Sequence, residues 1–208
     1  MRNEAMHLRH CTAAVLTVLL FSLAVSGGEL LDRIARNMGA IRTLQAEFEQ
    51  EKQLKAFAFP VRLTGELCME QNGRLAWIVR EPLPYTCIIE GSRLTQWDAD
   101  TDKTVAVDTS RNPSLRILAE SIRRLLAGDP RAMLDRFDVV REANPLELKP
   151  KPGAAAVLAR IQFRFSEDLA RMEEIVMTES SGDVTRIRFR NSRINEKIPE
   201  KKWQPRQK

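Results

Sequence analysis

The 208-residue sequence predicts an α+β fold in which a single curved antiparallel β-sheet is covered by an N-terminal helix and a central helical lid. Three observations predict this fold. A helix-spaced apolar segment precedes a long series of segments in which apolar and polar residues alternate. Turn-forming residues separate these segments at short intervals, as in a meander of neighbouring strands. A second helix-spaced segment interrupts the series midway, and the length fits one domain with its own core.

The first 26 residues have the features of a secretory signal peptide. Arg2 and Arg9 precede an apolar run that extends to Val25, and the run ends in Ala24-Val25-Ser26, a small-x-small cleavage pattern. The run is shorter than the apolar segment that a transmembrane helix requires. We expect a signal peptide over residues 1–26 and one exported domain over residues 27–208. An uncleaved N-terminal anchor is the alternative.

The composition of the cleaved chain excludes several catalytic mechanisms and one kind of metal site. Cleavage removes two of the 33 basic and one of the 28 acidic residues, which leaves a mildly basic net charge of about +4. It also removes both histidines of the sequence. A Ser-His-Asp or Cys-His mechanism and a histidine-ligated metal each need an imidazole. We therefore expect no enzyme, no catalytic or metal residues, and no cofactor.

The first elements follow from a change of period. Apolar residues at spacings of three and four, from Leu30 to Leu44, predict a helix over residues 29 to about 43. Alternation then begins at Leu44 and predicts a first strand. A second strand is expected from about Phe59 to Glu70, with one apolar face and one wet face.

The turn Gln71-Asn72-Gly73 leaves two registers for the first hairpin. A two-residue Asn-Gly turn would pair Leu67 with Ile78, whereas a three-residue loop with Gly73 in the left-handed conformation pairs Leu67 with Trp77. The second register is preferred because it places the apolar residues of both strands on one face. The same face continues through Tyr85, Cys87 and Ile89 into the next strand.

The rest of the chain repeats the strand pattern around one helical insertion. A helix from Ser114 to Gly128 and a short helix from Asp129-Pro130 through about Leu134 are expected in the middle. The C-terminal tail, rich in lysine, is expected to be exposed and partly ordered. Further strands are predicted at residues 93–98, 103–108, 137–141, 147–149, 156–165, 171–179 and 185–190.

A sheet with one apolar face needs a cover, and the two helical segments are available to form it. Two outcomes are open at this point. The helices and sheet pack into a dry core, or they enclose a cavity.

The order of several short motifs resembles the LolA-like family of periplasmic outer-membrane lipoprotein carriers, over essentially the whole cleaved chain. The motifs are Leu44-Gln45-Ala46-Glu47-Phe48-Glu49-Gln50, Gly65-Glu66-Leu67, Gly73-Arg74-Leu75-Ala76-Trp77, Pro82, Ile89-Glu90-Gly91, Leu125-Leu126-Ala127-Gly128-Asp129, Gly182-Asp183 and a closing segment from Asn195 to Trp203. The family fold is an unclosed half-barrel with a helical lid over a hydrophobic cavity.

The resemblance implies that the chain carries acyl chains across the periplasm of a Gram-negative bacterium. It implies an acylated lipoprotein or lipid as cargo, an inner-membrane exporter and an outer-membrane acceptor as partners, and transient contact with a membrane surface. We expect a monomer and no nucleic-acid partner. The expected cavity wall is Leu63, Leu67, Met69, Leu75, Trp77, Val79, Ile89, Phe163, Phe165, Met177 and Phe189, and the expected lid residues are Leu118, Ile122 and Leu125. Ordinary core is the alternative role for each of them, and a non-enzymatic envelope scaffold is the alternative function.

One motif departs from the family. Carriers of this family commonly have an Arg-Pro pair in the first hairpin, and its arginine holds the lid closed by hydrogen bonds. This chain has Gln71-Asn72 there, and a glutamine lacks the charge and the five donors of a guanidinium. The departure puts both the lid lock and the identity of the cargo, lipoprotein or other lipid, in question.

Four further sets of polar or reactive residues give no specific indication of function. Asp98-x-Asp100-x-Asp102 lacks the later ligands of a calcium loop and is expected to be a polar hairpin. The acidic pairs Glu66 with Glu70 and Glu173 with Glu174 are expected at the surface. An arginine stripe is either a solvent-exposed face of the sheet or a docking face for anions; it consists of Arg160, Arg164, Arg186, Arg188 and Arg190. Cys68 and Cys87 are expected on separate strands and opposite faces, hence as free thiols.

Overall fold

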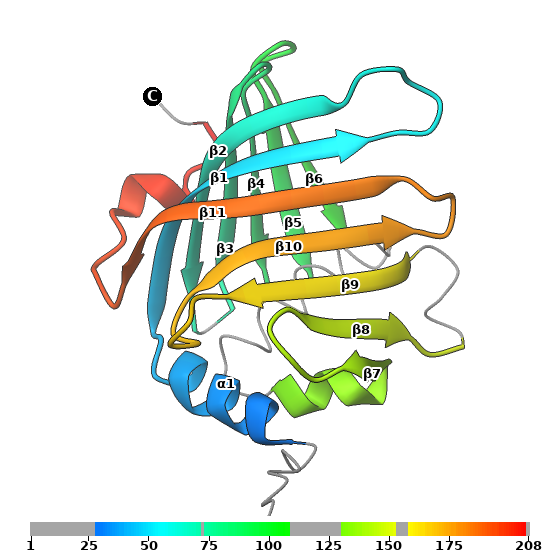
Figure 1. Ribbon diagram of the computed structural model, residues 1–208. Helices are drawn as coiled ribbons and strands as arrows, with labels where there is room; N and C mark the ends of the chain where they lie inside the picture. The colour runs from blue at the N-terminus through cyan, green and yellow to red at the C-terminus, as the bar shows by residue number, and fades with distance from the viewer. Residues whose placement is uncertain (1–27, 72, 109–129, 153–157, 207–208) are drawn as a thin grey trace, which may run out of the picture.

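The main element of the structure is one antiparallel sheet of eleven strands, shown in Figure 1. The computed structural model describes residues 28–71, 73–108, 130–152 and 158–206. Its elements are α1 (Glu29–Gly39), β1 (Thr43–Gln53), β2 (Val61–Glu70), β3 (Leu75–Glu81), β4 (Tyr85–Glu90), β5 (Arg93–Asp98), β6 (Lys103–Asp108), the 3₁₀ helix η2 (Pro130–Asp135), β7 (Phe137–Arg141), β8 (Leu146–Pro150), β9 (Leu158–Phe165), β10 (Met172–Glu179), β11 (Val184–Ile194) and the 3₁₀ helix η3 (Glu200–Trp203).

The strand order is that of two meanders joined side by side. It runs β6-β5-β4-β3-β2-β1-β11-β10-β9-β8-β7, so consecutive strands pair with each other except β6 and β7, which form the two edges, and β1 pairs with β11 to join the two meanders. The sheet bends so that its two halves face each other, while the end strands β6 and β7 do not meet (Figure 1). The predicted α+β fold with an unclosed half-barrel sheet is therefore confirmed.

The β2–β3 hairpin has the preferred register of the two. Leu67 pairs with Trp77 and Met69 with Leu75. Gly73 has a φ of 96°, which L side chains rarely adopt, and its N–H donates to the carbonyl of Glu70. The turn residue thus sets which side chains of both strands share a face.

Helix α1 lies across one end of the half-barrel, next to η2 (Figure 1). Its apolar side chains Leu31, Ile34 and Met38 are buried against the sheet. The helix ends at Gly39, four residues before the predicted end, because Ile41 and Leu44 continue the apolar spacing by chance where the period changes. The expected lid residues Leu118, Ile122 and Leu125 lie outside the described residues, as does the expected signal peptide.

The C-terminal tail is only partly exposed: Lys197, Lys201 and Arg206 are exposed as predicted, whereas its two large apolar residues are not. Residues 198–203 pack on the convex face of β2 to β4, where Ile198 and Trp203 are buried. The guanidinium of Arg74 lies 4.4 Å from the Trp203 ring centroid, in cation–π contact. The convex face therefore carries a second apolar cluster, made of Cys68, Ala76, Ile78, Ile88, Ile198 and Trp203.

Candidate functional site

The structure brings all eleven predicted wall residues to the concave side of the sheet. They belong to one apolar cluster that α1 and η2 also join. Three of them, Leu63, Trp77 and Met177, remain partly exposed. Buried members are Leu67, Met69, Leu75, Val79, Ile89, Phe163, Phe165 and Phe189.

Strand alternation and register gather these residues from six strands. Within a strand, every second side chain faces the same side, so Leu63, Leu67 and Met69 of β2 share the concave face. Pairing carries that face across the sheet. On β3 and β4, Leu75 lies beside Ile89, and the far half of the sheet contributes Phe163, Phe165, Met177 and Phe189.

An aromatic stack in the wall was missed by the sequence analysis. The ring of Phe48 lies 3.8 Å from that of Trp77, at an interplanar angle of 20°. Gly65 makes the stack possible, because a Cβ at that position would lie 2.6 Å from Phe48 Cζ and 2.1 Å from the carbonyl oxygen of Ile78. A glycine inside a strand pattern signals such a close approach.

Polar contacts hold α1 over the concave face at both ends. Glu142 accepts hydrogen bonds from the backbone N–H groups of Gly28 at 2.6 Å and Leu31 at 3.4 Å, and its charge favours the helix N-terminus. At the other end, Asn195 donates to the carbonyl of Ala40 at 3.1 Å. Gln71 in the β2–β3 turn donates to the carbonyl of Gly39 at 3.3 Å.

The space between α1 and the sheet is small. A pocket of about 20 Å³ is bounded by Met38 and Ile41 on one side and by wall residues Leu67 and Phe189 on the other. That volume accommodates about one water molecule. Room for an acyl chain at this place requires α1 to move away from the sheet.

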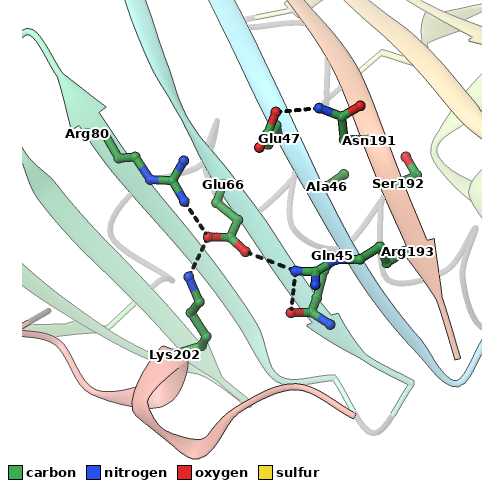
Figure 2. A pocket seen from close by; sticks show the side chains of 9 residues that line it. All are labelled: Gln45, Ala46, Glu47, Glu66, Arg80, Asn191, Ser192, Arg193 and Lys202. Carbon is green, nitrogen blue, oxygen red and sulfur yellow. Dashed lines mark hydrogen bonds and ion pairs between the residues drawn. The ribbon is translucent and has the colours of Figure 1, made fainter. Parts of the chain in front are cut away.

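A polar groove of about 560 Å³ lies on the opposite, convex face (Figure 2). Figure 2 shows its centre, the Glu66 carboxylate, which lies 2.5 Å from Lys202 Nζ and 2.8 Å from Arg80 Nη2. Arg193 lies 3.9 Å from the same carboxylate and donates to Gln45. Glu66 is only 5% exposed, so the prediction that it lies at the surface is wrong: the C-terminal segment covers it, and Lys202 fastens that segment to the sheet.

Glu174 on β10 is a second buried carboxylate where a surface position was predicted. It is 9% exposed and lies 3.0 Å from Arg186 Nη1, 3.1 Å from Arg188 Nε and 3.6 Å from Arg164 Nε. Burial by itself would raise the pKa of Glu174, but the hydrogen bonds and charges of Arg186 and Arg188 outweigh it and lower the pKa. Much of the arginine stripe is thus neutralised within the protein; Arg160 pairs with Glu147 and Arg190 with Glu49.

The two cysteines lie where the sequence placed them, on opposite faces of β2 and β4 with β3 between. Cys68 pairs with Ala76 in the convex cluster, whereas Cys87 pairs with Trp77 of the wall. Both thiols are buried and free. Burial, aided by the Glu66 carboxylate, raises the pKa of Cys68 to about 12, and burial raises that of Cys87 to about 12.

The aspartate-rich turn between β5 and β6 is a polar hairpin, as predicted. Asp102 accepts a hydrogen bond from Trp97 Nε1 at 3.0 Å and pairs with Arg206 at 3.0 Å. Across the described ranges, no group of three or more His, Cys, Asp or Glu side chains is arranged to hold a metal. No helix in the described part of the chain combines the length and apolar content that a membrane span requires.

Comparisons with known proteins agree with this geometry. The family model of the outer membrane lipoprotein carrier protein LolA matches residues 39–206. An outer-membrane lipoprotein carrier protein from Legionella pneumophila is 22% identical over 91% of this chain and 92% of its own length. One from Pseudomonas entomophila is 25% identical over 82% of this chain and 81% of its own. A solved DUF1329 family protein from Desulfovibrio piger shares the fold with a TM-score of 0.51, at 11% identity, over 84% of this chain and 95% of that one.

Proposed function

Because the chain belongs to the LolA family of outer membrane lipoprotein carrier proteins, we propose that it carries an acylated cargo, a lipoprotein or another lipid, with the acyl chains shielded on its concave face. The transfer runs from an inner-membrane exporter, through the periplasm, to an outer-membrane acceptor. The carrier is the domain that remains after residues 1–26 are removed. The function requires binding and release and no enzymatic reaction.

The observation that carries this proposal is the continuous apolar wall. Its members come from both halves of the half-barrel and face one another across the concave side. Leu63, Trp77 and Met177 are the members that a cargo reaches first, because they are partly exposed. A wall of this kind binds hydrocarbon of varied structure, since apolar burial is not directional.

The energy available from such a wall suffices for carriage without covalent chemistry. Each buried methylene contributes about 0.8 kcal/mol, so a chain of about 16 carbons gains on the order of 10 kcal/mol. Part of this gain is offset by the apolar contacts that Leu31, Ile34 and Met38 of α1 lose when the helix moves aside. Release then occurs when α1 returns, as its contacts with Glu142 and Asn195 re-form.

Binding of a fluorescent fatty acid tests the proposal. We expect saturable binding by the purified protein and a dissociation constant at least about tenfold higher for Met177→Asp, because a charge in an apolar site is costly. Val140→Asp is the matched control, since Val140 is an exposed residue of β7 outside the wall. Absence of saturable binding to the wild type, or equal effects of the two variants, would contradict the proposal.

A non-enzymatic scaffold of the cell envelope is the second candidate. The small volume of the pocket between α1 and the sheet favours it, because a filled core leaves no place for a cargo. A scaffold would bind its partner through the arginine stripe or along a sheet edge. The same fatty-acid experiment separates the two functions, as a scaffold with a closed core does not bind the dye.

A further inference from the structure

The loop between β1 and β2, residues 54–60, exposes two phenylalanine rings. Phe59 is 83% and Phe57 60% exposed, and Val61 at the start of β2 is 47% exposed. Single exposed apolar residues are ordinary, whereas three within five positions at one hairpin tip form a patch that calls for an apolar partner. In Figure 1 this tip lies at one end of the sheet, on the same side as the β10–β11 turn.

The rings are exposed although the loop backbone is fixed. The N–H of Phe57 donates to the carbonyl of Leu54 at 3.0 Å, and the Gln53 amide donates to both Leu54 and Phe57 carbonyls. The N–H of Lys55 donates to the Asp183 carboxylate at 2.9 Å, which ties the loop to the neighbouring β10–β11 turn. The loop therefore presents its two rings to the solvent from an anchored frame.

The exposed patch continues into the cavity wall along β2. Val61, Leu63, Leu67 and Met69 lie on one face of the strand because they are two or four residues apart. Their exposure falls along the strand: Val61 is exposed, Leu63 is partly buried, and Leu67 and Met69 are buried. At Gly65, which lacks a side chain, the Phe48 ring fills the interval. An apolar track thus leads from the hairpin tip to the wall.

The charges around the tip balance one another. Lys52 pairs with Glu179 at 2.9 Å and Arg62 with Glu51 at 3.1 Å, and the Lys55 backbone binds Asp183. A tip with aromatic rings and no excess charge suits the interfacial layer of a bilayer, where aromatic side chains are favoured, better than an acidic or basic peptide.

We propose that Phe57 and Phe59 insert into the surface layer of a phospholipid bilayer and place the outer end of the apolar track at the membrane. The inference rests on the proposed carrier function for its purpose, since the track would guide acyl chains between the bilayer and the wall. The contact itself is a separate property of the tip. The net charge of about +4 that remains after cleavage adds a long-range attraction to anionic lipid.

Flotation with vesicles of phosphatidylethanolamine and phosphatidylglycerol tests the contact. We expect the wild-type protein to float with the vesicles, and the double variant Phe57→Ser/Phe59→Ser to bind them about 10- to 100-fold more weakly. Val140→Ser, which removes an exposed side chain on β7, should float like the wild type. Binding should persist at about 0.5 M salt, where the screening length of about 4 Å suppresses attraction through the arginine stripe.

The possible results separate this inference from the carrier function. Wild-type protein that does not float would overturn the proposed membrane contact. A double variant that floats as well as the wild type would also overturn it, because the protein would then bind the vesicles through another surface. Thermal unfolding of the double variant should match the wild type, because both rings are exposed. Fatty-acid binding in solution should also be retained by the double variant. Its absence from the wild type would contradict the carrier function whatever the flotation result.

Discussion

Replacing Glu66 by alanine takes the shared carboxylate away from Lys202 and Arg80. The Lys202 side chain is 17% exposed, so its ammonium stays largely buried after it has lost this partner. The Arg80 side chain is 53% exposed, so water solvates its guanidinium in place of the carboxylate. Breaking a buried ion pair costs about 3–5 kcal/mol, and the open groove favours the lower end, about 3 kcal/mol. With a typical slope of about 2 kcal/mol per molar urea, the unfolding midpoint should fall by about 1.5 M.

Urea denaturation followed by tryptophan fluorescence measures this change, with Glu173→Ala as an exposed-carboxylate control that should stay within about 0.5 kcal/mol of the wild type. A double-mutant cycle of Glu66→Gln and Lys202→Met should give a coupling energy of at least about 1 kcal/mol. Additive effects in the cycle, or a Glu66→Ala midpoint equal to that of the wild type, would refute the view that this carboxylate fastens the C-terminal segment.

Three further outcomes are expected. Gly65→Ala should lower the free energy of unfolding by about 1–3 kcal/mol, because its Cβ would press on a backbone carbonyl and a phenyl ring; an unchanged urea midpoint would contradict the close approach. The folded-state pKa of Glu174 lies below its unfolded value, so its stabilisation is present above the unfolded pKa and is lost as the pH falls through the folded pKa. Glu174→Gln should therefore flatten the acid side of the stability curve in denaturations from about pH 3 to 6, and a variant that keeps the wild-type slope would contradict this role of Glu174. Cys68 and Cys87, both buried and with their pKa raised to about 12, should react with a thiol reagent at about pH 8 only on unfolding; rapid labelling of the native protein would count against their burial.

Local patterns predicted the sheet well because strand faces and turns are local properties. Gly73 and the alternation on either side of it were enough to choose between two registers one residue apart. The predicted strands at residues 93–98, 103–108 and 137–141 agree with the structure. The eleven wall residues gather on one face for the same reason, although their role as a binding surface stays a proposal.

The errors concern contacts between residues far apart in the sequence. Lys202 and Glu66 are 136 positions apart in the sequence, and the hydrophobic periodicity of neither segment predicts that the tail covers the convex face. Ile198 and Trp203, two large apolar residues in a charged tail, were the available signal. Glu174 was misplaced because a carboxylate in an alternating strand normally faces water, and the arginines that permit its burial all come from the neighbouring strands β9 and β11.

Native mass spectrometry of the protein purified from a bacterial periplasm, followed by denaturation and lipid analysis, tests the carrier account most directly. The account predicts a discrete acylated molecule bound to the wild-type chain and its loss from Leu63→Asp, which places a charge on a partly exposed part of the wall. A wild-type protein that carries no acylated molecule and does not bind added fatty acid would contradict the account and favour the scaffold function.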